Sequence, residues 1–440
     1  MTERIEQPDG SRSPASVVAS GSEPGDEAPR AAVIGTGFIG PVHVEALRRA
    51  GVHVTGILGS SAAKSRAAAA RLGLPRGYET LDELLADDAV ESVHITSPNR
   101  FHYEQTVAAL AAGKHVLCEK PLAMEARESQ DLVERAAASD RVTGVAYNLR
   151  FYPLCREAAG RIRSEEFGRT LHVTGSYTQD WLLNDTDYNW RVAANEGGSL
   201  RAVADIGTHW LDLVQAIVGQ PVTAVLADLQ TVHEVRHRPV GGRQTFTADA
   251  AEPAATEPVA IATEDAGCVL LRFAGGARGS LHVSQTTAGR KNCLRWEIAG
   301  SRRSLAFNSE RPNVLWIGSR DTANEQLVRD PALLSPAAAS IASYPGGHNE
   351  GFPDTFKHLM IAFYAATRGA GRESCGVASF ADGHRELLLC EAILQSHREE
   401  RWVAIDSSSR QPSQGAAVCH MTPRDAAESR TAGESPGAGS

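Results

Sequence analysis

AAVIGTGFIGPVHVEALRRAG, residues 31–51, contains the pattern that decides the fold. An apolar run of strand length is followed by a glycine-rich turn and then by a segment with the apolar spacing of a helix. In such a turn the first glycine permits a tight bend, the second lets a ligand approach the backbone, and the third lets helix and strand pack closely. The stretch therefore predicts a strand, turn and helix that bind the pyrophosphate of a dinucleotide. The predicted contacts are Gly35, Thr36, Gly37, Phe38, Ile39 and Gly40.

The same alternation of strand and helix patterns continues to about residue 150. The apolar runs HVTGIL, SVHITS, HVLCEK and VTGVAY begin at residues 53, 92, 115 and 142, with segments of helical periodicity between them. Short strands separated by helices require right-handed crossovers and a parallel sheet. Residues 31–150 are therefore predicted to form an α/β domain, a doubly wound parallel sheet of the Rossmann type.

The sequence pattern changes after about residue 151. The runs CVLLRFAGG, ARGSLHVSQTT, CLRWEIAG, RSLAFN and NVLWIG succeed one another between residues 268 and 318 with only polar or glycine-rich turns between them, which is typical of an antiparallel meander. Residues 151–405 are predicted to form a second, α+β domain with a mainly antiparallel sheet, on which helices at about 352–368 and 379–397 pack. The polar stretch 236–262 is expected to be a long loop insertion.

Composition limits the class of partner. The 440 residues carry a net charge of -9, which disfavours binding to nucleic acid or to anionic membranes, and 42% of them are hydrophobic. Residues 1–29 and 406–440 are rich in Ser, Pro, Gly, Ala and charge, and are predicted to be disordered tails. Residues 1–29 hold no apolar signal segment, and the seven cysteines form no C-x-x-C pair. We expect a cytoplasmic protein with a small-molecule partner.

HVLCEKPLA, residues 115–123, places charged residues where a buried strand should end. Ligands of open parallel sheets bind outside the carboxyl ends of the strands, so Glu119, Lys120 and Pro121 are expected at the nicotinamide end of a dinucleotide. The alternative is that Glu119 and Lys120 form a solvated charge pair at the end of a strand. The neighbouring strand ends at the same edge with TSPNRFH, and the last strand is followed by further polar residues. These segments add Thr96, Ser97, Pro98, Asn99, His102, Asn148 and Arg150 to the predicted cofactor contacts.

GGSLRAVADIGTHWLDL, residues 197–213, carries Asp205 and His209 four positions apart. If a helix begins near Asp205, both side chains lie on one face. The alternative is an Asp that caps the helix and a hydrogen-bonded buried His.

Together, the glycine motif, Glu119-Lys120-Pro121 and the Asp205-x-x-x-His209 element resemble the glucose–fructose oxidoreductase and inositol dehydrogenase family of NAD(P)-dependent oxidoreductases, over about residues 31–400. The resemblance implies a Rossmann domain, a second domain whose sheet forms a homo-oligomer interface, and a sugar or cyclitol substrate. It also implies that Lys120, Asp205 and His209 are catalytic. The segment just before Asp205 supplies groups suited to a polyhydroxylated ring, so the predicted substrate contacts are Tyr188, Asn189, Trp190, Arg191, Asp205 and His209.

The predicted activity is a dehydrogenase that passes hydride between a sugar or polyol and the cofactor. His209, with a reference pKa near 6.5, is the preferred proton acceptor. Lys120 would hydrogen-bond the reacting oxygen and Asp205 would orient substrate or His209, although the division between Lys120 and His209 stays open. Two alternatives remain: a glycosidase that uses bound NAD without net redox change, and a catalytically silent sensor. The presence of both Lys120 and His209 counts against the sensor.

A zinc site is not expected. His233 and His237 match the H-E-x-x-H pattern, but that pattern needs a helix, and the preceding VTAVLADLQTV reads as a strand.

The cofactor is expected to be NADP at least as readily as NAD. NAD-binding folds usually carry an acid about 20 residues beyond the glycine motif, and no acid occurs from Val52 through Ala70. Ser60 and Ser61, with Lys64 and Arg66 one turn later, offer groups for a 2′-phosphate instead.

Overall fold

A computed structural model describes residues 28–240, 255–370 and 375–405. The tails predicted at 1–29 and 406–440 lie outside the described residues, apart from residues 28 and 29. No helix in these ranges is both long enough and apolar enough to span a membrane.

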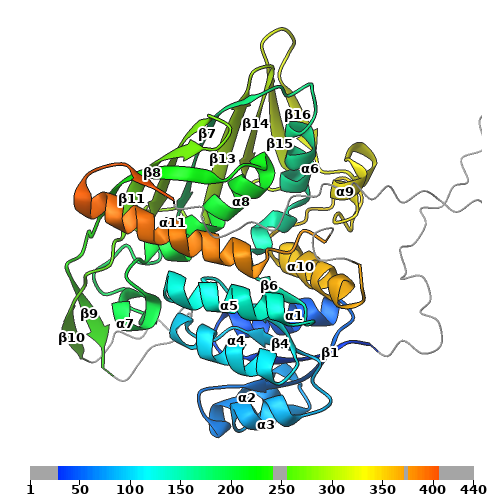
Figure 1. The fold of residues 1–440 in the computed structure, drawn as a ribbon, viewed down its shortest axis with the longest axis vertical. Coiled ribbons are helices and arrows are strands. Elements are labelled where there is room, and N and C mark those ends of the chain that lie inside the picture. Colours follow the sequence, from blue (N-terminus) through cyan, green and yellow to red (C-terminus); the bar gives the residue numbers. More distant parts are fainter. Residues whose placement is uncertain (1–27, 241–254, 371–374, 406–440) are drawn as a thin grey trace, which may run out of the picture. The chain divides into compact units, whose positions relative to one another are not determined.

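The first domain is a parallel six-stranded sheet with the order β3-β2-β1-β4-β5-β6 (Figure 1). Its strands are short and almost wholly buried, because helices cover both faces of the sheet. The Rossmann prediction is therefore confirmed. The strands are β1 (Arg30–Ile34), β2 (His53–Leu58), β3 (Arg76–Tyr78), β4 (Ser92–Ile95), β5 (His115–Cys118) and β6 (Thr143–Val145). The helices are α1 (Ile39–Arg49), α2 (Ala62–Leu72), α3 (Leu81–Ala86), α4 (His102–Ala111) and α5 (Ala126–Ala138), with turns η1 (Asn99–Phe101) and η2 (Asn148–Phe151).

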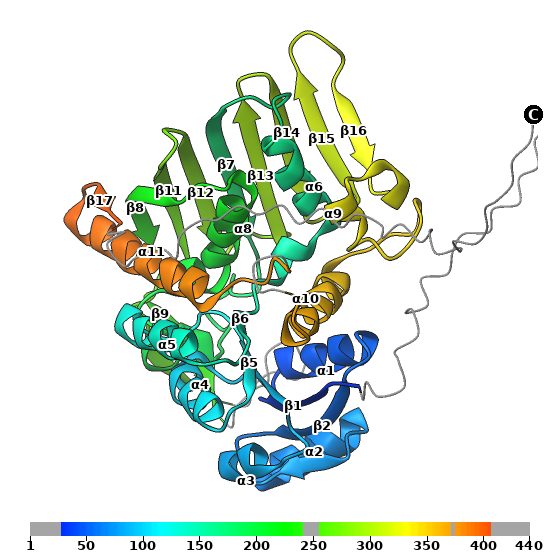
Figure 2. The same cartoon turned by 45° about the vertical axis from the view of Figure 1, so that its right-hand side comes forward.

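The second domain is a nine-stranded sheet with the order β16-β15-β14-β13-β7-β12-β11-β8-β17. All neighbours are antiparallel except β7 and β12, which confirms the predicted mainly antiparallel sheet. Apolar residues alternate along the strands, and helices cover one face only (Figure 2). The strands are β7 (Thr170–Thr178), β8 (Val222–Gln230), β11 (Ala266–Phe273), β12 (Arg278–Ser284), β13 (Cys293–Gly300), β14 (Arg303–Asn308), β15 (Val314–Ser319), β16 (Glu325–Val328) and β17 (Val403–Ala404). The helices of this part of the chain are α6 (Pro153–Ile162), α7 (Ala194–Gly197), α8 (Thr208–Val218), α9 (Pro336–Ala339), α10 (Phe352–Thr367) and α11 (Phe380–Glu399).

The two late helices occur where predicted, but one of them packs elsewhere. Helix α11 lies along β8 of the nine-stranded sheet, as expected. Helix α10 instead packs against α1, and its Phe356, Met360 and Phe363 join the apolar core that contains Val33 of β1. The prediction that α10 packs on the second sheet was wrong, because apolar periodicity shows that a helix face is buried but not against what.

The segment predicted as a loop at 236–262 begins and ends in strands. β9 (Val235–Pro239) and β10 (Thr256–Ala260) pair antiparallel as a separate two-stranded ribbon. Residues 241–254 lie outside the described residues. The strand that includes His237 also confirms that the H-E-x-x-H pattern does not lie on a helix.

Candidate active site

The glycine-rich turn between β1 and α1 has no room for side chains on its inner side and open space on its outer side. A Cβ atom on Gly35, whose φ is +120°, would lie 2.5 Å from the carbonyl oxygen of Thr96, and one on Gly40 would lie 2.1 Å from that of Gly35. A Cβ on Gly37 would meet nothing within 4 Å. Strand and helix are therefore held together while the backbone near Gly37 stays accessible. These features fit the pyrophosphate of a dinucleotide.

Lys120 crosses from the edge of the first sheet to the second domain. It follows β5, and its Nζ donates to the backbone oxygen of Asp205 at 2.5 Å and to Asp205 Oδ1 at 2.9 Å. Glu119, the other charged residue, turns the opposite way and accepts a hydrogen bond from His43 Nε2 at 3.0 Å. The solvated charge pair that was the alternative is thus absent, since both side chains are largely buried.

Asp205 gathers donors from three segments. Besides Lys120, Gln285 Nε2 donates to its Oδ2 at 2.9 Å and Arg191 Nε lies 3.4 Å from its Oδ1. Burial alone would raise the pKa of Asp205, but Lys120 and Arg191 hold it well below its ordinary value. Asp205 is therefore an anion that fixes the Lys120 ammonium group. Gln285, which follows β12, was not predicted, and a single Gln at a strand end carries no sequence signal.

His209 stands one turn beyond Asp205. A π-helical turn (Val203–Gly207) leads into α8, so Asp205 does not act as the helix N-cap. The Nδ1 of His209 is buried and has no hydrogen-bond partner among the described residues, and its ring lies edge-on to that of Tyr147. The capping alternative is thus not observed.

The protonation of His209 differs from what the sequence suggested. Burial, followed by the charge of Lys120, lowers its pKa to about 3. The ring is neutral near pH 7 and does not titrate near its reference value of about 6.5.

Only one of the four aromatic and polar residues predicted at 188–191 reaches Asp205. Arg191 does so, with its guanidinium over the ring of Trp190 at 4.5 Å from the ring centre. The side chain of Asn189 accepts from the backbone of Arg191 and caps the short helix Trp190–Val192. Tyr188 packs in a small apolar cluster with Leu182. Asn189 and Tyr188 therefore shape the segment from which Arg191 projects.

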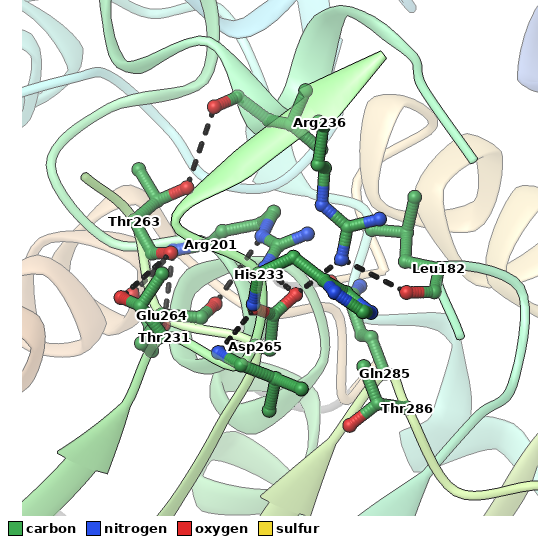
Figure 3. Close-up of polar contacts among 12 residues, drawn as sticks. Leu182, Arg201, Thr231, His233, Arg236, Thr263, Glu264, Asp265, Gln285 and Thr286 are labelled. Carbon is green, nitrogen blue, oxygen red and sulfur yellow. Dashed lines mark hydrogen bonds and ion pairs between the residues drawn. The ribbon is translucent and has the colours of Figure 1, made fainter. Parts of the chain in front are cut away.

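A buried cluster of ion pairs contacts the loop that precedes this segment, at Leu182 (Figure 3). Arg201 and Arg236, both fully buried, share the carboxylate of Asp265. Arg236 also donates to the backbone oxygen of Leu182 at 2.9 Å, while the backbone N–H of Gln285 donates to that of Asp265 at 2.9 Å. The cluster connects β9, the loop that contains Leu182, and Gln285. It was not predicted, because its members are far apart in sequence.

The predicted cofactor residues after β4 brace the sheet edge. Thr96 Oγ1 donates to Ile34 O at 2.8 Å, and Asn99 Nδ2 to Gly197 O at 3.0 Å. The ring nitrogens of His102 lie 2.7 Å from Pro121 O and 2.9 Å from Ser97 O. The loops after β4 and β5 are thereby joined at the edge where the glycine turn lies.

Asn148 and Arg150, predicted to contact cofactor, are engaged within the protein. Asn148 donates to Thr355 at 2.7 Å, and Arg150 forms a two-point ion pair with Asp212 at 2.5 and 2.8 Å. The structure thus uses their side chains to connect the end of β6 with α10 and α8.

At the end of β2, two of the residues predicted to contact a 2′-phosphate lie side by side. Lys64 Nζ donates to Ser60 Oγ at 3.1 Å, and Ser61 caps α2. Arg66, in contrast, is directed to Glu79, with 2.7 Å between Nη1 and the carboxylate.

Comparison with known proteins identifies the family and the fold. Residues 29–147 match the model of an oxidoreductase family with an NAD-binding Rossmann fold, and residues 155–306 match the GFO/IDH/MocA C-terminal domain. A levoglucosan dehydrogenase of Pseudarthrobacter phenanthrenivorans is 31% identical over 346 residues, which are 78% of this chain and 87% of that one. The chain belongs to the GFO/IDH/MocA family of oxidoreductases.

Solved structures of GFO/IDH/MocA oxidoreductases have the same fold as this chain. Levoglucosan dehydrogenase in complex with NADH and L-sorbose superposes with a TM-score of 0.76 at 28% identity, covering 87% of this chain and all of that one. An inositol dehydrogenase homologue from Azotobacter vinelandii, in complex with NAD+, gives a TM-score of 0.73 at 26% identity, with 86% of this chain and 97% of that one covered. The fold of this chain is thus that of the family, with an NAD-binding Rossmann domain.

Proposed function

We propose that this protein is an NAD(P)-dependent dehydrogenase that oxidises a CH–OH group of a sugar or related polyol. The observation that carries the proposal is the meeting of Lys120, Asp205 and a neutral His209 beside the cofactor edge of the Rossmann sheet. The buried Nδ1 of His209 has no hydrogen-bond partner among the described residues. Relatives named levoglucosan dehydrogenase and inositol 2-dehydrogenase support the substrate class.

Each residue has a role that follows from its contacts. Lys120, held by Asp205, offers a positive donor to the reacting oxygen and stabilises the alkoxide that develops as hydride leaves. His209 is neutral, so it can accept a hydrogen bond from the substrate hydroxyl and receive its proton. The cofactor supplies the hydride acceptor.

A substrate panel tests the proposal. Purified protein is mixed with NAD+ or NADP+ and with sugars, inositols and 1,5-anhydro sugars, and reduced cofactor is followed by its absorbance. We expect steady formation of reduced cofactor with at least one polyol. No response to any of them would refute the proposal, and turnover of a glycoside without reduced cofactor would indicate a redox-neutral glycosidase.

Arg191 is expected to act on the substrate side. Because its guanidinium lies beside Asp205, Arg191→Ala removes a charged donor that can reach a substrate hydroxyl, and the substrate KM should rise about tenfold. The cofactor Kd should change less than about twofold, as steady-state kinetics and cofactor titration will show. Arg100→Ala, which breaks the more exposed pair with Glu196, is the control and should leave KM unchanged. Equal effects of Arg191→Ala on KM and cofactor Kd would place this residue away from the sugar.

Cofactor choice is expected to depend on Ser60. Lys64 and Ser60 together can hold a 2′-phosphate, so kcat/KM with NADP+ should be at least comparable with that for NAD+. Ser60→Asp should shift the preference toward NAD+ through repulsion of the phosphate and a new ribose contact. Arg71→Ala, an exposed change in the last turn of α2, is the control and should leave the ratio unchanged. A wild-type enzyme that strongly prefers NAD+, or no shift in Ser60→Asp, would contradict this assignment.

We further infer a homo-oligomer formed through the uncovered face of the nine-stranded sheet. Leu270 of β11 is 47% exposed there, on a strand whose alternate residues are buried. Light scattering coupled to size-exclusion chromatography tests this, and a monomer at micromolar concentration would contradict it.

A further inference from the structure

A chain of hydrogen bonds runs from Glu119 into the buried interior of the first domain. Glu119 Oε1 lies 3.0 Å from His43 Nε2, and His43 Nδ1 lies 3.2 Å from His94 Nδ1. His94 Nε2 lies 2.9 Å from the hydroxyl of Tyr364, which lies 2.6 Å from Ser92 Oγ. All five side chains are buried, and they come from α1, β4, the end of β5 and α10. The dehydrogenase chemistry described above uses none of these bonds.

The partners in this chain permit two arrangements of protons. When Glu119 is ionised, every donor points toward it: His43 to the carboxylate, His94 to His43, Tyr364 to His94, and Ser92 to Tyr364. When one proton is added between Glu119 and His43, every hydrogen bond of the series is donated in the opposite direction, away from Glu119. Ser92 then donates to the carbonyl oxygen of Arg30, which lies 3.2 Å away. No member of the chain loses its partner in either arrangement. The chain can therefore hold Glu119 charged or uncharged without an unsatisfied polar group.

The environment favours the charged arrangement. Burial opposes ionisation of Glu119, but the hydrogen bond from His43 and the charge of Lys120 lower its pKa. Burial lowers the pKa of His94 far below its ordinary value, and burial raises that of Tyr364. The groups that face the two ends are Lys120, His209 and His102 near Glu119, and Glu91 near Tyr364.

Glu119 matters for the balance of charge at the site. Lys120 and Arg191 are positive and Asp205 is negative, while His209 and His102 are neutral because burial lowers their pKa. An ionised Glu119 brings these groups to neutrality. Without it, an oxidised nicotinamide, which is a cation, would enter a site with an excess positive charge.

Resting on the proposed use of a nicotinamide cofactor, we propose that the carboxylate of Glu119, held by His43, is a fixed negative charge that makes the site bind oxidised cofactor more tightly, relative to reduced cofactor, than it otherwise would. Glu119 is the charge-balancing residue, and His43 positions it. Glu119 belongs at the cofactor edge because its backbone N–H donates to Ile95 at the end of β4, beside the glycine turn.

The test is Glu119→Gln, read out by binding. A Gln amide can donate to His43 as the uncharged arrangement requires, so the variant keeps the chain intact and removes only the charge. The Kd values of oxidised and reduced cofactor are measured by calorimetry for both nucleotide pairs. We expect the ratio of the oxidised to the reduced Kd to rise about tenfold, the order produced by a unit charge about 12 Å away at an effective dielectric near 20. The reduced Kd should change less than about twofold.

Tyr364→Phe is the matched control. It removes a hydroxyl from the far part of the chain but leaves the carboxylate, so the melting temperature should fall while the Kd ratio stays within about twofold of wild type. An unchanged ratio in Glu119→Gln, or equal weakening of both Kd values, would overturn the proposal. A wild-type protein that binds neither oxidised nor reduced cofactor would refute both this proposal and the dehydrogenase proposal. A protein that binds both cofactor forms but oxidises no polyol would refute only the dehydrogenase proposal.

Discussion

Lys120→Ala is expected to lower kcat/KM for the sugar substrate by about 100-fold or more. The ammonium group is the positive donor that we assign to the reacting oxygen, and its loss removes stabilisation of the alkoxide. It also leaves the Asp205 carboxylate with Gln285 and Arg191 as its side-chain donors among the described residues. Cofactor affinity should change far less, because the glycine turn that binds the pyrophosphate is untouched.

Two further measurements make the Lys120 result specific. Circular dichroism and thermal melting should show that Lys120→Ala is folded, and Lys120→Arg, which keeps the charge but changes the donor geometry, should recover part of the lost kcat/KM. A folded Lys120→Ala enzyme with turnover close to wild type would show that Lys120 does not take part in the reaction.

His209→Ala is expected to lower kcat/KM by about 100-fold or more, mainly through kcat. The ring is neutral and its Nδ1 has no partner in the described part of the chain, so its loss removes the predicted receiver of the hydroxyl proton. Rates of the folded variant, followed by cofactor absorbance, check this. Near wild-type turnover would remove His209 from the mechanism.

The pH dependence of kcat/KM distinguishes a His209 ring with a lowered pKa from a histidine base that titrates near its ordinary value. Since burial and Lys120 lower the pKa of His209 to about 3, its ring stays neutral in the free enzyme throughout pH 5–8. We therefore expect no loss of kcat/KM with a midpoint near 6.5 that is attributable to this residue. Such a midpoint in the wild-type profile that disappears in an active His209 variant would show that the ring titrates normally.

Sequence patterns predicted the local part of this structure well. The strand, glycine turn and helix at 31–51 are determined by neighbouring residues, since a positive φ at Gly35 and the apolar spacing of α1 are local requirements. The edge position of Lys120 followed from a general property of parallel sheets. The four-residue spacing of Asp205 and His209 likewise placed both on one turn.

What the sequence did not reveal depends on contacts between distant segments. The packing of α10 against α1, the bond from Gln285 to Asp205 and the pairing of Arg236 with Asp265 each join residues from different parts of the chain. The low pKa of His209 also arises from burial and from Lys120, 89 positions away in the sequence. None of these leaves a periodic or motif signal.

Deuterium transfer tests the central claim most directly. A sugar that responds in the substrate panel is prepared with deuterium on its carbon atoms and oxidised by the enzyme with unlabelled cofactor in ordinary water. We expect the isolated reduced cofactor to carry deuterium from the sugar, as its mass measured by mass spectrometry will show. The reason is that hydride passes directly from sugar to cofactor in the proposed site formed by Lys120, Asp205 and His209. Reduced cofactor without deuterium would contradict it.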